Sequence, residues 1–392
     1  MKFAILGIHP KLSRAELKAV TGADFLYSTN ECVLFDSPAK LEDLQKTLGG
    51  VIKLGEVIES IDNIQALEPT LLKYLQNQPR EKKLRFGMSV YDAGGTSFSK
   101  NLRRENQKLG LSLKKSLKQS GRSVRLVTST ESTLSSVVVA KNKLTTDGLE
   151  FCLLPTAECI LIGVTKTYQD FEDWSHRDYE RPARDAKNGM IPPKLARIMV
   201  NLSGVNSFIQ HSTSNIQPRT LLDPFCGSGT ILMEAALVGI QNIIGADISE
   251  KILADAKENL DWLKDQGEDV LKIELIQSAA AILKIKNKAD IVVTEPFLGK
   301  PRQGKEGEAE VKKMVLELET LYADCFSNIV KLMKPGATLV LAAPVHKIKK
   351  AEYPLAIKNI MNQAGLVNLT SPIRYERENQ FIGRDIWIFT KR

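Results

Sequence analysis

The chain has 392 residues, too many for one ordinary hydrophobic core and enough for two or three domains. Hydrophobic residues make up 43% of it, charged residues 26% and aromatic residues 6%, shares that exclude a disordered, collagen-like or coiled-coil chain. No apolar run reaches the roughly 18 residues that a membrane span needs, and the first ten residues lack the apolar core of a signal peptide. We therefore expect a cytoplasmic protein with no membrane partner.

The five cysteines and four histidines favour neither a disulfide framework nor a metal centre. No two cysteines have the C-x-x-C spacing, and an odd number of cysteines fits a reducing compartment. The histidines are scattered, so a zinc site built from His and Cys is not expected. We expect no metal.

The positive charge is concentrated in one part of the chain. The formal net charge is +8, and residues 81–125 hold twelve Lys and Arg against three Asp and Glu. The rest of the chain is therefore close to neutral. A basic block of this kind indicates a polyanionic partner, with nucleic acid as the first candidate. The alternative is a helix face that is merely solvated.

Residues 1–62 predict a small α+β domain. Ser13 and Glu16 have the spacing of a capping box, which predicts a helix from Ser13 to about Val20. The Gly49-Gly50 pair predicts the end of a second helix, over 41–48. Apolar runs predict strands over 2–6, 31–35 and 53–58.

Residues 63–168 predict a second block of mixed structure. The expected strands cover 84–91, 123–128, 150–154 and 159–164, and the expected helices cover 101–119 and 134–144. On the helix over 101–119, four leucines share one face, which indicates core. The basic side chains lie largely away from that face.

Residues 169–193 are rich in charge and proline and show no periodicity, so they are interpreted as a linker. Pro192 and Pro193 then begin a helix. Residues 194–392 alternate between strand and helix, which predicts an α/β domain with a mostly parallel, doubly wound sheet. The expected elements are strands over 220–222, 242–246, 272–277, 290–294, 337–343 and 384–389, and helices over 230–238, 250–263 and 311–333.

A glycine-containing turn follows the first strand of that alternation, at residues 223–230. Gly227 and Gly229 let the backbone approach a ligand closely at the start of a helix. Asp247, about 20 residues later, ends the next strand, where an acidic side chain can bind ribose hydroxyls. The turn lacks the Lys-Ser/Thr of a P-loop, and Leu232 stands where a dinucleotide fingerprint needs a third small residue. An adenosine ligand without a pyrophosphate fits best. The alternative is structural: Asp223 caps the turn and Asp247 lies at a surface strand end.

The residues from 223 to 230 resemble motif I of S-adenosylmethionine-dependent amino-methyltransferases. The stretches 177–182 and 189–202 resemble those that precede motif I in THUMP-domain tRNA guanine-N2 methyltransferases, and the block around 114–144 looks like the THUMP RNA-binding domain. The resemblance covers nearly the whole chain. It implies a ferredoxin-like domain over 1–62, a THUMP domain over 63–168, a linker over 169–193 and a Rossmann-like class I methyltransferase domain over 194–392.

The resemblance also implies the cofactor and its site. Asp223, Gly227 and Gly229 would hold the methionine end of S-adenosylmethionine, and Asp247 would bind its ribose. The adenine position has no acidic residue here, so Ser278 or backbone groups would serve. The expected cofactor-binding residues are Asp223, Phe225, Cys226, Gly227, Gly229, Thr230, Asp247, Ile248, Ser278 and Ala279.

The expected catalytic residues are Glu295, Pro296 and Phe297. The family carries Asp/Asn-Pro-Pro-Tyr/Phe, whereas this chain has Thr-Glu-Pro-Phe-Leu at 294–298, which leaves two registers open. Either Glu295 replaces the acid and Leu298 the aromatic residue, or Thr294 replaces the acid and Phe297 is the aromatic residue. In both, a carboxylate and the Pro296 carbonyl can hold an amine, and Phe297 can stack on a base. The alternative is a surface Glu295 and a core Phe297.

The function that the sequence predicts is methyl transfer to the N2 amine of a guanosine in tRNA. The first alternative is a non-catalytic RNA-binding protein that keeps the fold, and the second is a DNA amino-methyltransferase. The polar segment over 300–308 is interpreted as a flexible loop that closes over the target or contacts RNA phosphates, with a plain solvated loop as the alternative. The partner is tRNA, with no protein partner indicated, and the expected RNA contacts are Arg103, Arg104, Lys108, Lys114, Lys115 and Lys118.

Overall fold

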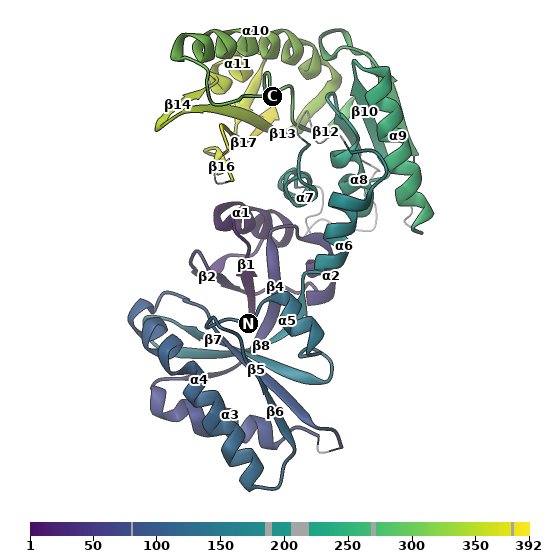
Figure 1. Ribbon diagram of the computed structural model, residues 1–392. Coiled ribbons are helices and arrows are strands. Elements are labelled where there is room, and N and C mark those ends of the chain that lie inside the picture. Colours follow the sequence, from purple (N-terminus) through teal and green to yellow (C-terminus); the bar gives the residue numbers. More distant parts are fainter. Residues whose placement is uncertain (80, 185–189, 205–218, 268–271, 378–379) are drawn as a thin grey trace. The chain divides into compact units, whose positions relative to one another are not determined.

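A computed structural model describes residues 1–79, 81–184, 190–204, 219–267, 272–377 and 380–392. These residues form two compact units, Met1–Glu172 and Asp173–Arg392 (Figure 1). In the described ranges no helix is both long and apolar enough to cross a membrane. No three His, Cys, Asp or Glu side chains of those ranges group as metal ligands.

The first unit contains one mixed sheet of eight strands, in the order β2-β3-β1-β4-β8-β7-β5-β6. Strand β4 pairs antiparallel with β8, from Lys53 opposite Tyr168 to Ile61 opposite Ile160, so the sheet continues past residue 62. The division of this unit into ferredoxin-like and THUMP domains stays a prediction. Its elements are β1 (Lys2–Leu6), α1 (Pro10–Thr21), β2 (Phe25–Ser28), β3 (Cys32–Phe35), α2 (Leu41–Thr47), β4 (Val51–Ile61), η1 (Ile64–Ala66), α3 (Leu67–Gln76), β5 (Leu84–Val90), α4 (Thr96–Gln119), β6 (Val124–Val127), α5 (Ser136–Lys141), β7 (Gly148–Pro155) and β8 (Ile160–Tyr168).

The predicted capping box in α1 is wrong. The helix begins at Pro10, and Ser13 lies inside it, where its hydroxyl donates to the His9 carbonyl. The buried Glu16 carboxylate instead accepts hydrogen bonds from the backbone N–H groups of Gly49 and Gly50, each at 2.8 Å. A β-carbon on Gly50 would lie 2.9 Å from the Cα of Ser13, so this close packing requires glycine. The pair of residues that resembles a local cap therefore forms a tertiary contact.

The second unit contains a nine-stranded sheet whose main path is β11-β10-β9-β12-β13-β17-β15. Strands β11, β10, β9, β12 and β13 are parallel neighbours, and β17 pairs antiparallel with β13. The predicted doubly wound α/β fold is confirmed. The elements are α6 (Phe171–Ser175), η2 (His176–Glu180), α7 (Pro193–Leu202), β9 (Thr220–Asp223), α8 (Thr230–Leu237), β10 (Asn242–Asp247), α9 (Glu250–Asp265), β11 (Lys272–Gln277), η3 (Ala280–Ile282), β12 (Ala289–Thr294), α10 (Glu308–Leu332), β13 (Met333–Ile348), β14 (Ala351–Pro354), α11 (Ile357–Gln363), β15 (Leu366–Asn368), β16 (Ile373–Tyr375) and β17 (Ile382–Lys391).

The direction of chain winding reverses at β9. The chain passes from β9 through α8 to β10 and through α9 to β11, and then returns to place β12 on the other side of β9. A crevice forms outside the carboxyl ends of the strands at such a reversal. Helices α10 and α11 cover one face of the sheet, and Tyr322, Phe326, Met361 and Phe389 are buried in the core there.

Part of the segment interpreted as a linker, residues 171–180, is helical, and its charged side chains include some with buried partners. The Arg177 guanidinium lies 4.2 Å from the Trp174 ring centroid, and its Nε lies 3.0 Å from Glu234 Oε1 on α8. The Arg197 Nη2 lies 2.7 Å from the other oxygen of the same carboxylate. Charge without periodicity therefore marks a buried ion cluster here. Residues 185–189, which include the Gly189 of the resemblance, lie outside the described residues.

Candidate functional site

A cavity of about 570 Å³ lies at the carboxyl ends of β9, β10, β11 and β12. It is lined by all three predicted catalytic residues and by every predicted cofactor-binding residue except Gly229. Residues that are more than 70 positions apart in the sequence therefore meet in one place. Their roles stay predictions, but their convergence is a property of the fold.

Asp223, the last residue of β9, is completely buried. Its Oδ1 accepts hydrogen bonds from the Thr294 hydroxyl at 2.7 Å and from the Phe225 N–H at 3.1 Å. Its Oδ2 accepts none from any residue that the structure describes. Burial raises the pKa of this carboxyl to about 7, against the opposing effect of the two hydrogen bonds. Asp223 therefore carries an acceptor that the protein itself leaves open at the cavity wall.

The turn after Asp223 adopts a conformation that depends on glycine. Gly227 and Gly229 have φ angles of 53° and 85°, in the left-handed region that L side chains rarely adopt. The Gly227 N–H donates to Asp247 Oδ2 at 3.2 Å, and the Ser249 N–H donates to Asp247 Oδ1 at 3.0 Å. Asp247 thus holds the glycine turn against the end of β10, in addition to facing the cavity.

The remaining predicted cofactor residues form a mixed polar and apolar wall. The Ser278 N–H donates to the Asp247 carbonyl at 3.0 Å, which places 278 and 279 beside the end of β10. Ile248 is 71% exposed, an unusual exposure for a large apolar side chain. The hydroxyl of Thr230, which also lines the cavity, accepts a hydrogen bond from the buried Arg181 at 2.7 Å. The sequence analysis gave Arg181 no role.

The segment that follows β12 places Glu295 in an ion pair. Arg384 on β17 donates from Nε to Glu295 Oε1 at 2.5 Å and from Nη2 to Oε2 at 3.4 Å. Each of the two side chains is 10% exposed. Burial lowers the pKa of Arg384, but the charge and hydrogen bonds of Glu295 outweigh it, so the net shift is upward. The sequence analysis missed this partner, which lies 89 residues away.

The structure favours one of the two registers for the catalytic segment. Thr294 is completely buried, and its hydroxyl donates to Asp223 rather than facing the cavity. Glu295 lines the cavity, as the register with Glu295 in the place of the family's acid predicts. Phe297 also lines the cavity and is 53% exposed, while its carbonyl accepts a hydrogen bond from the buried Tyr322 hydroxyl at 3.2 Å. An aromatic face is thus available on a fixed backbone.

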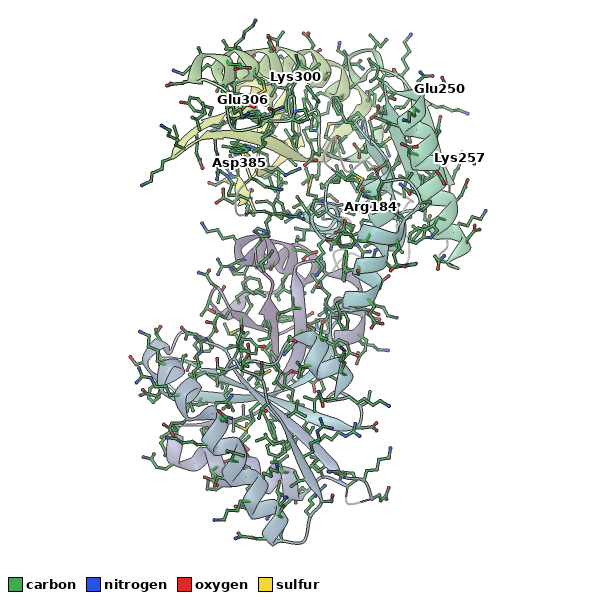
Figure 2. All side chains as sticks on the ribbon, viewed as in Figure 1. Arg184, Glu250, Lys257, Lys300, Glu306 and Asp385 are labelled. Atoms are coloured by element: carbon green, nitrogen blue, oxygen red, sulfur yellow. The ribbon has the colours of Figure 1, made fainter. Side chains whose placement is uncertain are left out.

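The loop after this segment, which carries Lys300 and Glu306 (Figure 2), is anchored rather than simply solvated. The Arg302 guanidinium donates to the Lys347 carbonyl at 2.6 Å, and its side chain is 3% exposed. Glu306 accepts from the N–H groups of Gln303 and Gly304, which lower its pKa. The Arg302 part of the loop therefore has fixed contacts in the structure, and the interpretation of 300–308 as a flexible loop stays a prediction.

The six predicted RNA contacts all lie on α4 in the first unit, with unequal exposure. Arg103 is paired with Glu31, Nη2 to Oε2 at 2.5 Å, and Lys114 is half-buried. Arg104, Lys108, Lys115 and Lys118 are exposed, and their spacing places them with the exposed Leu111 along one face of the helix. We call these four basic residues the α4 stripe.

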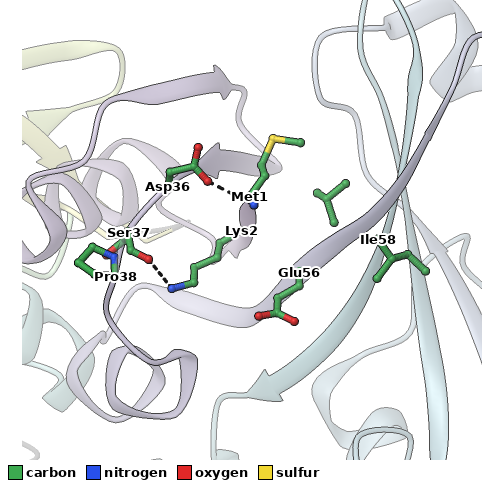
Figure 3. A pocket seen from close by; sticks show the side chains of 8 residues that line it. Met1, Lys2, Asp36, Ser37, Pro38, Glu56 and Ile58 are labelled. Atoms are coloured by element: carbon green, nitrogen blue, oxygen red, sulfur yellow. Dashed lines mark hydrogen bonds and ion pairs between the residues drawn. The ribbon is translucent and has the colours of Figure 1, made fainter.

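A second cavity, of about 470 Å³, lies beside β1 in the first unit (Figure 3). The Lys2 ammonium donates to the carbonyls of Ser37 and Ala39, and the Met1 amino group lies 3.3 Å from Asp36 Oδ1. Because Lys2 and Met1 are thus bound to neighbouring groups of the same chain, we interpret this cavity as structural.

The fold and the cavity define the class of the second unit as a Rossmann-like S-adenosylmethionine-dependent methyltransferase. Residues 181–360 match the family model described as RMKL-like, methyltransferase domain. The predicted resemblance is thereby confirmed for the second unit.

The chain is also similar to named proteins. It is 35% identical over 156 residues to a tRNA (guanine(10)-N2)-dimethyltransferase of Methanothermobacter thermautotrophicus, covering 40% of this chain and 39% of that protein. It is 30% identical over 158 residues to the U6 snRNA (guanine-N(2))-methyltransferase THUMPD2 of Bos taurus, covering 38% and 27% respectively. The chain thus spans less than half the length of these curated relatives.

Among solved structures, the crystal structure of TrmN from Thermus thermophilus superimposes with a TM-score of 0.55 at 17% identity. The match covers 100% of this chain and 99% of that one. At this identity the likeness shows the fold alone, and it shows it for both units.

Proposed function

We propose that the protein transfers a methyl group from S-adenosylmethionine to the N2 amine of a guanosine in tRNA. The observation that carries the proposal is one cavity lined both by Asp223, whose Oδ2 has no hydrogen-bond partner among the described residues, and by Glu295, Pro296 and Phe297. The names of the sequence relatives support the choice of RNA guanine as the substrate. A tRNA substrate also agrees with the cytoplasmic location predicted from the sequence.

The residues of the cavity fit the proposed cofactor. The unpartnered Asp223 oxygen is suited to a cationic donor such as the cofactor's ammonium group, because an ionised acceptor gives the stronger hydrogen bond. The left-handed glycines at 227 and 229 keep the turn free of β-carbons, and Gly227 has open space where a β-carbon would stand. Asp247 supplies a carboxylate for hydroxyl donors, and the exposed Ile248 supplies an apolar surface for a purine ring.

The catalytic segment fits the amine. When bound, S-adenosylmethionine supplies an electrophilic methyl group; the amine lone pair forms the new C–N bond, the C–S pair stays on sulfur, and one amine proton is released. Glu295 and the Pro296 carbonyl accept hydrogen bonds from the amine and orient its lone pair. The Glu295 carboxylate also faces the proton that leaves. Phe297 stacks on the base once it has left the RNA stack.

The α4 stripe supplies the contact to the RNA backbone in this proposal. Arg104, Lys108, Lys115 and Lys118 bind phosphates through charge, which fixes the position of the RNA without reading its sequence. The roles of Arg103 and Lys114 are secondary, because the first is paired with Glu31 and the second is half-buried.

Transfer of labelled methyl from S-adenosylmethionine into tRNA that lacks modifications, followed by nucleoside analysis, tests the proposal. The expected result is an N2-methylguanosine peak. Tight binding of tRNA and cofactor without any transfer would support the non-catalytic alternative instead. Methylated adenine or cytosine in duplex DNA, offered as a competitor, would support the DNA amino-methyltransferase alternative.

A further inference from the structure

The Glu295–Arg384 pair is built asymmetrically. Arg384 holds Oε1 at 2.5 Å, whereas Oε2 lies 3.4 Å from the nearest guanidinium nitrogen. Glu295 lines the cavity and Arg384 does not. In the part of the chain that the structure describes, Arg384 is the one group found to donate hydrogen bonds to this carboxylate. The carboxylate therefore has accepting capacity left on the side of the cavity.

Arg384 is held in place from several directions. It lies on β17 opposite Pro344 of β13 and opposite Tyr375 of β16, and it is 8% exposed. The charged or titratable groups that act on it are Glu295, Tyr375 and Tyr322. A buried guanidinium fixed in this way limits the rotation of the carboxylate paired with it, because separating the two charges would leave both desolvated.

An ionised carboxylate accepts hydrogen bonds and cannot donate them. Guanine presents two adjacent donors on its Watson–Crick edge, the N1–H and the N2 amine. Adenine and cytosine also carry an exocyclic amine there, but each has an acceptor nitrogen beside it. Against those two bases, an anionic carboxylate would face a lone pair instead of a donor, and this unmatched contact disfavours both of them relative to guanine.

We infer that Glu295, held by Arg384, selects guanine by accepting hydrogen bonds from N1–H and the N2 amine together. Glu295 is the specificity-determining residue, and Arg384 is a positioning residue that acts through it. The inference rests on the proposed function and deepens it, because it explains how an active site for amino groups distinguishes guanine from adenine and cytosine.

The first experiment varies the target base and uses the wild-type protein. Once the target guanosine is mapped, tRNA is assembled with 2-aminopurine at that position, which keeps the 2-amine but makes N1 an acceptor. A second tRNA carries 6-thioguanine, which keeps N1–H and controls for the loss of O6. We expect similar rates for guanine and 6-thioguanine and a rate about 10- to 100-fold lower for 2-aminopurine.

Variants of Glu295 and Arg384 then test whether these two residues determine the choice of base. In E295Q the amide oxygen accepts from the amine and the amide NH2 donates to N1, so the 2-aminopurine-to-guanine rate ratio should rise at least about tenfold over wild type. In R384M the freed carboxylate should discriminate less, which raises the same ratio. The controls E352Q and R374M each remove one member of the Glu352–Arg374 salt bridge, in which Nη1 and Oε1 are 2.8 Å apart and which does not line the cavity. Both controls should keep the wild-type ratio of 2-aminopurine to guanine rates.

Equal rates of methylation of guanine and 2-aminopurine by the wild-type protein would overturn the inference, and this result needs no variant to fold. An unchanged ratio in E295Q that binds S-adenosylhomocysteine normally would overturn it as well. Both outcomes differ from failure of the proposed function, in which the wild-type protein forms no N2-methylguanosine. That failure would also overturn the inference.

Discussion

Each unit of the protein has a completely buried carboxylate on a strand of its sheet, and the two carboxylates differ in how many of their oxygens accept hydrogen bonds. Glu150 in β7 accepts hydrogen bonds from Lys53, Ser89 and Thr165, each at 2.6 Å, so both of its oxygens are used. Asp223 at the end of β9 has one oxygen used and one oxygen open. A completed network of this kind stabilises one arrangement of strands, whereas an incomplete one at a cavity wall marks a place for a ligand.

The largest expected effect is on catalysis. Glu295→Ala removes the acceptor for the target amine and leaves the Arg384 charge without its partner, so methyl transfer should fall at least about 100-fold. Binding of cofactor and tRNA should change little. The measurement is labelled-methyl incorporation, with Glu352→Ala as a control that removes an arginine-paired carboxylate outside the cavity. Equal activity of Glu295→Ala and wild type would remove the assigned role.

The next effect is on the stability of the first unit. Glu150→Ala leaves the Lys53 ammonium buried without its carboxylate, which should cost about 3–5 kcal/mol of unfolding free energy. Denaturant unfolding measures this loss, and the double variant Lys53→Met with Glu150→Leu should recover much of it. A single Glu150 variant as stable as wild type would show that the network contributes nothing.

The open carboxyl should make the stability of the second unit depend on pH. The pKa of Asp223 is raised by burial from an unfolded value near 3.8 to about 7, so the folded form holds a proton that the unfolded form has lost. The stability from this group is complete below about pH 4 and is lost as the pH rises to about 7. The difference in unfolding free energy between wild type and Asp223→Asn should decrease over that window. A constant difference would contradict the shift.

The smallest expected effect is on RNA affinity. Lys115→Ala removes one charge of the α4 stripe and should weaken tRNA binding only severalfold, while the slope of log affinity against log salt falls by about 0.7–0.9. Binding titrations over a range of salt concentrations measure both. Lys257→Ala removes an exposed lysine from α9, where it is paired with Asp261, and should leave the slope unchanged.

The sequence predicts the parts of the site that depend on local spacing. The strand, the glycine turn, the helix and Asp247 occur within 30 residues. Their order and spacing are typical of a nucleoside-binding site in an α/β sheet, so they can be predicted together. The partners of Glu295 and Glu16 could not be predicted in this way, because each pairs with groups far along the chain. Helix α3, over Leu67–Gln76, was missed although its buried leucines, Leu67, Leu71 and Leu75, recur at helical spacing.

Other signals in the sequence carry information about long-range partners that composition alone does not give. The charges over 169–181 lack periodicity, which is typical of linkers, but here Arg177 and Arg181 are buried against α8. A glutamate in an otherwise apolar helix, as Glu234 is in α8, indicates a buried cation partner. Glu234 could therefore have predicted that arginines such as Arg177 and Arg197 pack against α8.

Calorimetric titration with S-adenosylhomocysteine, in buffers of different ionisation enthalpy near pH 6.5, tests most directly whether the open Asp223 oxygen receives the cofactor. Wild type should release a proton on binding, because the ligand's ammonium group favours the ionised carboxylate. Asp223→Asn should bind about 10- to 100-fold more weakly and release no proton from this site. Equal affinity and equal proton release in the two proteins would contradict the account.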